Sequence, residues 1–136
     1  MSRPRRIEHE VVYPHSPARV WRALVDPGEL AAWLMPTDFA PEPGHTFSLE
    51  SGDDHVGTIR GEVLEIDEPR LLRCSWSGGF GDTEVTFELF PEGEGTRLRV
   101  RHDGWKEPLD ADRAGFDDGW KQKLEHDLPR VLGSGN

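Results

Sequence analysis

Residues 116–128 read FDDGWKQKLEHDL, and they decide how the rest of the chain is interpreted. Large apolar residues recur at every fourth position, which is typical of an amphipathic helix. This apolar stripe consists of Phe116, Trp120, Leu124 and Leu128, and Val131 and Leu132 extend it. We therefore predict one long helix over residues 110–132 with the stripe as its inner face. Pro129 is expected to end or kink this helix, because proline lacks a backbone N–H and clashes with the preceding turn.

The same helix carries Gly115 and Gly119 in its first turns. A glycine costs a helix roughly 1 kcal/mol relative to alanine, so its presence needs a reason. We expect these glycines to permit a close approach of the backbone near a binding site. In this interpretation the charged residues between the apolar ones form the solvated side, namely Lys121, Lys123, Glu125 and Asp127.

A series of strand patterns precedes the helix. The clearest pair covers residues 83–90 and 96–102, on either side of the turn PEGEG. Apolar and polar residues alternate in both segments, so one face is apolar and the other sets glutamates beside arginines. We expect cross-strand ion pairs on the solvent side and interpret the arginines as structural, not as a ligand-binding patch. The other predicted strands cover residues 5–13, 45–50, 56–66 and 71–77.

Two short helices are predicted between the first strand and the others. Ser16 is a typical N-cap, with Pro17 at the first helical position. Asp26 starts the second helix, and Glu29 follows three residues later as in a capping box. The order of strand, two short helices, about five strands and a long helix predicts an α+β fold with one antiparallel sheet. We expect a single domain over residues 1–136.

The composition restricts the functions to consider. The net charge is −10 at pH 7, and an acidic surface repels phosphate backbones, so no nucleic-acid partner is expected. The single cysteine, Cys74, cannot form an internal disulfide. No apolar run approaches the roughly 20 residues of a membrane span, and the polar, basic first residues do not resemble a signal peptide. We therefore expect a cytoplasmic protein with no membrane partner.

Four segments of the chain, taken together and in order, resemble one family. They read SPARVWRALVDPGELAAWL, GTIRGEVLEIDEPRLLRCSW, TEVTFELFPEGEGTRLRVRHDGW and GWKQKLEHDL. They are similar to the activator of Hsp90 ATPase homologue 1-like family of the START-like (SRPBCC) superfamily. The resemblance implies a helix-grip fold, in which a curved antiparallel sheet of about six strands surrounds a long C-terminal helix. It also implies a cavity between the two, where members bind lipids, polyketides, hormones or other hydrophobic molecules.

We expect a binding site in that space, because a large apolar pocket with a few polar groups is the usual ligand site. The ligand expected is a small hydrophobic or aromatic molecule. The expected ligand-binding residues are Trp33, Met35, Phe39, Trp76, Phe80, Phe87, His102, Trp105, Phe116, Trp120 and Leu124. Periodicity fits both an open cavity and a tightly packed interior, and both alternatives stay open at this point.

Candidates for catalysis and metal binding are few. None of the six histidines has a metal-ligand spacing such as HExxH, and Asp53-Asp54 and Asp117-Asp118 fit turn and helix-start roles. His9 and His102 fall on inward strand faces, where a histidine satisfied by backbone or water is favoured over a ligand or base. Cys74 alternates with apolar residues and is interpreted as a small buried hydrophobe. We expect no cofactor, no metal and no catalytic residue, which favours a protein that is not an enzyme.

The segment SGGFGD, residues 77–82, joins two predicted strands. We interpret it as a hairpin connection with glycines at positive φ. The alternative is a flexible lid that carries Phe80 over the mouth of a cavity.

Three other functions compete with ligand binding. The family's name suggests a protein-interaction role on an Hsp90-type chaperone. A polyketide cyclase-like enzyme would use His9 or His102 as its acid–base group. Some proteins that resemble this fold protect antibiotic producers from enediynes by being cleaved at a glycine. Several glycines here lie beside expected cavity aromatics, namely Gly79, Gly81, Gly104, Gly115 and Gly119.

Overall fold

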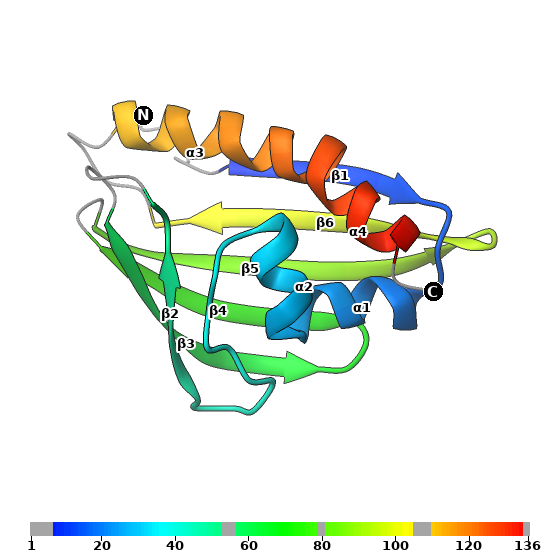
Figure 1. Cartoon of the computed structure of the whole chain (residues 1–136), viewed down its shortest axis with the longest axis horizontal. Helices are drawn as coiled ribbons and strands as arrows, with labels where there is room; N and C mark the ends of the chain where they lie inside the picture. The colour runs from blue at the N-terminus through cyan, green and yellow to red at the C-terminus, as the bar shows by residue number, and fades with distance from the viewer. Residues whose placement is uncertain (1–6, 53–56, 79–80, 105–109, 135–136) are drawn as a thin grey trace, which may run out of the picture.

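The computed structural model describes residues 7–52, 57–78, 81–104 and 110–134. Its centre is one six-stranded sheet in the order β1-β6-β5-β4-β3-β2, in which every neighbouring pair is antiparallel (Figure 1). The strands are β1 (Ile7–Tyr13), β2 (Thr46–Glu50), β3 (Thr58–Asp67), β4 (Leu71–Gly78), β5 (Gly81–Glu92) and β6 (Gly95–Asp103). The predicted α+β fold with one antiparallel sheet is therefore confirmed.

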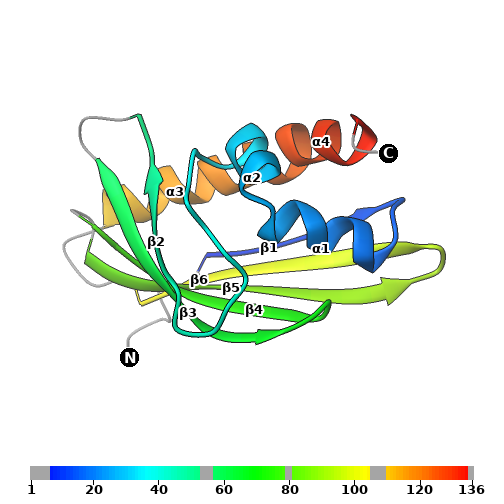
Figure 2. The same ribbon diagram turned by 60° about the horizontal axis from the view of Figure 1, so that its bottom comes forward.

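The described helices lie on one face of the sheet, which curves around them (Figure 2). They are α1 (Pro17–Val25), α2 (Pro27–Trp33), α3 (Asp110–Gln122) and α4 (Leu128–Ser134), and a π-helical turn (Lys123–Asp127) joins the last two. In Figure 1, α3 begins over one end of the sheet, while α1 and α2 cover the other end beside α4. This is the helix-grip arrangement that the resemblance implied. None of these helices is long and apolar enough to cross a membrane.

The hairpin of β5 and β6 has the predicted alternation. Phe87 lies opposite Val100 on the buried face. On the outer face Glu88 accepts hydrogen bonds from Arg99, at 2.9 Å from Nη2, and from Arg101. Ion pairs of this kind contribute little to stability one by one. Arg99 and Arg101 are thus paired with a glutamate of the same sheet, which agrees with the prediction that these arginines are structural and do not form a ligand-binding patch.

Both short helices begin at the predicted capping residues. Arg19 N donates to Ser16 Oγ at 3.2 Å, and Glu29 N donates to Asp26 Oδ2 at 2.9 Å. The capping box predicted for Glu29 is wrong in its second half, because the Asp26 N–H donates to Arg22 O. The Glu29 carboxylate instead accepts from Arg19 Nη1 at 2.7 Å and from Arg22 Nε at 2.8 Å. Glu29 thus ties α2 to α1.

Pro129 does not end the C-terminal helix, so the first of its two predicted effects, an end or a kink, is wrong. In the turn before it, Leu128 N–H donates to Lys123 O, five residues back, which is the wider spacing of a π-helix. Such π turns are a recognised way for a helix to absorb an irregularity without stopping. The helix therefore passes the proline and continues to Ser134.

Leu124 O is satisfied from outside the helix. It would accept from residue 128 in an α-helix or from residue 129 in a π-helix, but Leu128 N–H is used by Lys123 O and Pro129 has no N–H. The hydroxyl of Tyr13 in β1 donates to Leu124 O at 2.6 Å. Burial raises the pKa of Tyr13, so this donor keeps its proton. The bond fixes the helix to the edge strand of the sheet.

Lys123 is not a purely solvated residue, which corrects its predicted place on the solvent side of the helix. Its side chain is half-buried, and Nζ donates to Leu34 O at 3.1 Å. Leu34 is the C-cap residue of α2, so the ammonium satisfies a carbonyl at the end of that helix. Lys123 therefore joins the C-terminal helix to α2.

The role predicted for the helix glycines is wrong. A Cβ added to Gly115 or Gly119 would meet no atom of the described residues within 4 Å. Close approach occurs instead at Gly61 in β3, where an added Cβ would lie 2.4 Å from Ser75 O and 2.5 Å from Phe47 Cζ. The ring of Phe47 thus packs directly on the backbone of β3, and only glycine leaves it room there.

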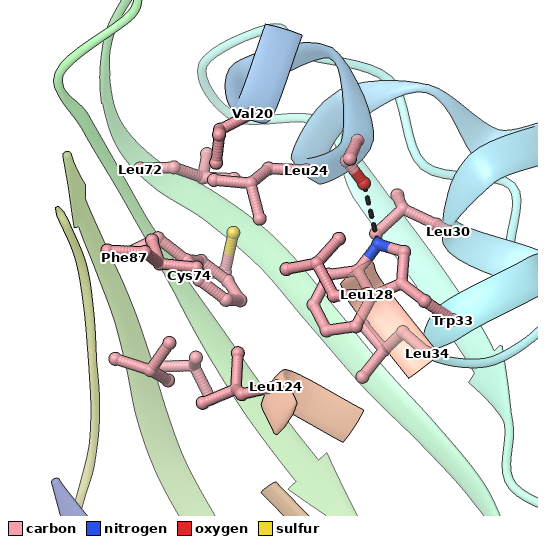
Figure 3. Close-up of a cluster of buried hydrophobic side chains, with 14 of the residues drawn as sticks. Val20, Leu24, Leu30, Trp33, Leu34, Leu72, Cys74, Phe87, Leu124 and Leu128 are labelled. Atoms are coloured by element: carbon pink, nitrogen blue, oxygen red, sulfur yellow. Dashed lines mark hydrogen bonds between the residues drawn. The ribbon is translucent and has the colours of Figure 1, made fainter. Parts of the chain in front are cut away.

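Aliphatic side chains fill the space under α1 and α2 (Figure 3). The members of this aliphatic core include Val20, Leu24, Leu30, Leu34, Leu72, Leu124 and Leu128. Trp33 of α2 is 1% exposed among them, and its indole N–H donates to Ala23 O at 2.7 Å. Cys74 and Phe87 of the sheet face the same core (Figure 3). This end of the interface is therefore held by close packing, in which the Trp33 indole is paired and the buried indole nitrogen of Trp21 has no hydrogen-bond partner among the described residues.

Candidate ligand-binding site

Predicted site residues from four elements meet in one aromatic cluster between the sheet and α3. Its members are Trp76 of β4, Phe87 of β5, His102 of β6, and Phe116 and Trp120 of α3. The side chains of the three sheet residues point toward α3, because successive side chains of a strand point to opposite faces and these three occupy the buried positions. Trp76 and Trp120 stack with ring centroids 5.5 Å apart, and Phe87 meets Trp120 edge-on at 5.8 Å. The rings are thus in mutual contact at favourable separations.

Phe116 is the member of the aromatic cluster that reaches the surface. The other four side chains are buried, whereas Phe116 is half-buried. Its ring centroid lies 6.4 Å from that of Trp76 and 5.4 Å from that of His102, in edge-on orientations. The aromatic cluster therefore runs from the core to the surface, and Phe116 is its outermost member among the residues that the structure describes.

A chain of hydrogen bonds passes through the aromatic cluster. Trp120 Nε1 lies 3.1 Å from His102 Nδ1, and His102 Nε2 lies 2.7 Å from Thr83 Oγ1. Thr83 Oγ1 in turn lies 2.8 Å from Trp76 O. A carbonyl oxygen only accepts and an indole N–H only donates. Thr83 therefore donates to Trp76 O and accepts from His102 Nε2–H, while Nδ1 accepts from Trp120.

These directions determine the state of His102. It is the neutral imidazole with its proton on Nε2, because Nδ1 must accept. The residue is 0% exposed, and burial lowers the pKa of His102 to about 3, so it stays neutral near pH 7. His102 is therefore a histidine with both ring nitrogens hydrogen-bonded, as the favoured interpretation expected. Its partners are the side chains of Thr83 in β5 and Trp120 in α3, whereas backbone groups or water were expected.

The buried positions of β4, β5 and β6 carry no charged side chain among the described residues. They are Leu72, Cys74, Trp76, Thr83, Val85, Phe87, Leu89, Thr96, Leu98, Val100 and His102. The arginines of these strands take the alternate positions, and Arg73 Nη1 lies 2.8 Å from Glu84 Oε1 on the outer face. The inner positions of these three strands are thus mainly apolar and carry no formal charge near pH 7.

His9 lies outside the aromatic cluster, at the edge of the sheet. Its Nε2 is 2.7 Å from Asp117 Oδ1, which links β1 to α3. The two side chains are 21% and 46% exposed. Asp117 was predicted to favour a helix start, but α3 begins seven residues earlier, at Asp110. The Asp117 carboxylate is instead within hydrogen-bond distance of His9 Nε2. His9 opposes Val100 in the register and does not face His102 as a partner.

Cys74 is a packing residue. Its thiol is buried, and burial raises the pKa of Cys74 to about 12, so the thiolate does not form near pH 7. His102, considered as its base, has both ring nitrogens engaged by Trp120 and Thr83. Within the described ranges no group of three or more His, Cys, Asp or Glu could hold a metal ion.

The structure places the remaining predicted site residues apart from these ring contacts. Trp33 belongs to the aliphatic core, and Met35 is partly buried just after α2. Phe39 packs edge-on against Phe47, with ring centroids 5.1 Å apart. Leu124 follows Trp120 by one helical turn and is buried in the aliphatic core. Phe80 and Trp105, and with them the lid interpretation, fall outside the described residues.

Thr83 is a site residue that the sequence reasoning missed. It precedes Val85 by two positions, so the alternation of β5 already placed it on the inner face. It also lies opposite Trp76 in the β4–β5 register. Its role depends on His102 of a third strand, and only the assembled sheet shows this contact.

Comparison with known proteins adds a family to this geometry. The sequence model of the family described as "Activator of Hsp90 ATPase homolog 1-like protein" matches residues 14–133. No protein of curated function matches the sequence. The family match covers the whole sheet apart from β1, and the described helices up to the last residue but one of α4.

Solved structures with the same fold cover nearly the whole chain. The protein MLL2253 from Mesorhizobium loti is 31% identical with a TM-score of 0.88, and the match covers 96% of this chain and 98% of that one. CalU16 from Micromonospora echinospora is 27% identical with a TM-score of 0.79, over 95% of this chain and 76% of that one. DynU16, a protein of the dynemicin biosynthetic locus, is 24% identical with a TM-score of 0.82. The match covers 96% of this chain and 48% of DynU16, and this likeness shows the fold alone.

Proposed function

The chain belongs to the activator of Hsp90 ATPase homolog 1-like family, and we propose that it binds a small hydrophobic or aromatic molecule between its sheet and its C-terminal helix. The proposed site is the aromatic cluster under α3. The observation that carries the proposal is that these rings continue from the core to the surface at Phe116, which is half-buried. The fold itself admits many functions, so the site has to support the proposal.

The two ends of the helix–sheet interface differ in what a ligand would have to displace. Under α1 and α2 a ligand would separate interlocked aliphatic side chains and leave cavities, which is costly. In the aromatic cluster a flat ligand would replace ring–ring contacts such as Trp76–Trp120 with ligand–ring contacts of the same kind. Entry therefore costs less free energy at the aromatic end.

The expected affinity follows from the area that a ligand buries. A naphthalene-sized molecule buries about 200 Å² and gains roughly 5 kcal/mol by transfer from water. That free energy corresponds to a dissociation constant of about 0.2 mM before any ring contact is added or lost. A probe that adds a third ring to naphthalene is therefore suited to a test in the micromolar range.

The test uses N-phenylnaphthylamine, an uncharged probe that the acidic surface does not repel. The five tryptophan indole N–H signals of the labelled protein are assigned by tryptophan-to-phenylalanine variants and followed during titration. We expect Trp76 and Trp120 to shift with saturation, and Trp33 to stay unchanged in the aliphatic core. Shifts confined to Trp33, or no shift of any indole, would refute the proposed site.

A matched pair of variants locates the probe further. Phe116→Ala truncates the ring at the outer limit of the aromatic cluster, and Phe90→Ala truncates a half-buried ring on the opposite face of the sheet. We expect the first to change the dissociation constant several-fold and the second to leave it unchanged. Equal dissociation constants for both variants and the wild type would place the probe elsewhere.

Other functions predict different outcomes in the same sample. A role on an Hsp90-type chaperone, which the family description suggests, predicts line broadening when the host's chaperone is added. A self-sacrificing resistance protein would be cut at a glycine by an activated enediyne, and intact-mass measurement after incubation detects the cut. A cyclase-like enzyme needs an available acid–base group. The bonded His102 does not supply one, and the other candidate, His9, lies at the sheet edge with Nε2 2.7 Å from Asp117 Oδ1, so loss of a turnover in His9→Gln would support this alternative.

A further inference from the structure

We infer that the aromatic cluster accepts uncharged aromatic molecules and rejects their carboxylates, because the polar groups at its centre have no spare hydrogen-bond donor and no positive charge. The inference rests on the proposed function, since it concerns the ligand of the same site. The ligands of the site would be uncharged aromatic molecules. Their selection over carboxylates would come from the missing hydrogen-bond donor and positive charge, and not from the apolar lining alone.

Each polar hydrogen in the hydrogen-bonded chain is already committed: the indole N–H of Trp120 to His102, Nε2–H of His102 to Thr83, and the hydroxyl of Thr83 to Trp76 O. What remains is acceptor capacity, because the Thr83 oxygen has two lone pairs and receives one bond. A ligand hydroxyl can still be accepted there, whereas a ligand carboxylate finds no donor unless a bond of the chain breaks.

His102 would become a cation only with a second proton on Nδ1, and that proton would point at the indole N–H of Trp120, 3.1 Å away. Two donors would then face each other, so an anionic ligand cannot recruit the imidazolium without breaking this contact. The buried positions of β4, β5 and β6 offer no other cation among the described residues.

The arginines of β6 lie on the outer face, where Arg99 and Arg101 share Glu88 and Arg97 pairs with Glu10 at 2.9 Å. They are separated from the aromatic cluster by the sheet itself. A carboxylate in the site would therefore lose its hydration without gaining a charged or hydrogen-bonding partner, which is strongly unfavourable.

The test compares three ligands of one ring system: naphthalene, naphthamide and naphthoate. Naphthamide matches naphthoate in size and shape, so the pair isolates charge. Titrations follow the indole signals of Trp76 and Trp120 at about 0.5 M NaCl, where the net charge of the protein is screened within a few ångströms. We expect naphthalene and naphthamide to bind and naphthoate to bind at least about tenfold more weakly.

The outcomes separate this inference from the proposed function. Naphthoate binding as tightly as naphthamide would overturn the inference and leave aromatic binding intact. If none of the three moves the two indole signals, the proposed function fails and the inference fails with it.

Two measurements test the physical cause directly. In the ligand-free protein, nitrogen NMR shifts of His102 should show a neutral ring protonated on Nε2 from about pH 8 to about pH 5. A charged ring, or a proton on Nδ1, would overturn the inference. Thr83→Val removes the acceptor of Nε2–H and so makes a donor available, while Thr83→Ser keeps the acceptor. The preference for naphthamide over naphthoate should shrink several-fold in the valine variant only, and an unchanged preference there would also count against the inference.

Discussion

The Tyr13 hydroxyl should stabilise the protein by supplying the hydrogen bond that the C-terminal helix cannot make for itself. Leu124 O has no helical donor, because Leu128 N–H goes to Lys123 O and Pro129 has no N–H. Tyr13 donates to this carbonyl at 2.6 Å, and its side chain is 2% exposed. Tyr13→Phe keeps the buried ring and removes only the donor.

The expected cost follows from that geometry. A lost hydrogen bond is worth about 1 kcal/mol net, and a buried polar group left without a partner costs about 1–3 kcal/mol. We therefore expect Tyr13→Phe to lower the free energy of unfolding by about 1–3 kcal/mol, measured by urea denaturation. Val12→Ala serves as the control, because the neighbouring Val12 is 53% exposed and its truncation should cost less than about 0.5 kcal/mol.

A double-mutant cycle tests the cause of the loss. Pro129→Ala restores an N–H that can reach Leu124 O or the next carbonyl, so the hydroxyl of Tyr13 should matter less in that background. We expect the cost of Tyr13→Phe to fall by at least about 0.5 kcal/mol when alanine replaces Pro129. Costs that agree within about 0.3 kcal/mol in the two backgrounds would refute the reasoning, because the two sites would then be independent.

Three further predictions follow from local geometry. Gly115→Ala and Gly119→Ala should each raise the free energy of unfolding by about 0.5–1 kcal/mol, since the added methyl meets open space, and a loss in urea denaturation would contradict this. Gly61→Ala should cost about 1–3 kcal/mol, because its Cβ would lie 2.4 Å from Ser75 O, and an unchanged midpoint would argue against that contact. Folded His102, with a pKa of about 3 against 6.5 for the free side chain, should make stability fall as pH drops from about 6.5 toward 3, by up to about 1.4 kcal/mol per unit. The unfolded state binds that proton first, so His102→Gln should flatten the pH dependence, and an equal slope in both proteins would contradict the assignment.

Features that depend on neighbouring residues could be predicted from the sequence. Ser16 and Asp26 cap their helices because each bond spans three residues and needs no other element. Strand alternation placed Phe87 and His102 inward for the same local reason. The capping box at Glu29 failed because a competing partner, Arg19, reaches it from the preceding helix.

Features that depend on distant partners could not be read from the sequence. A proline in a helical pattern predicts an end or a kink, and the donor that satisfies Leu124 O in the π-helical turn is Tyr13, 111 residues away along the chain. The state of His102 likewise depends on Thr83 and Trp120, which lie on a different strand and a helix. Periodicity reports which face a residue occupies, and it carries no information on which donor it meets there.

The hydrogen-bonded chain also explains how an aromatic interior can be stable before any ligand enters. A buried histidine with an unpaired nitrogen would require water or a ligand to complete it. His102 is instead paired on both nitrogens by Trp120 and Thr83, so the cluster is complete without either. A ligand must then compete with the stacking of Trp76 on Trp120, not with the solvation of a polar group. Affinity in a series of uncharged ligands should therefore rise with the aromatic area that each one buries, and added hydrogen-bond acceptors should contribute nothing.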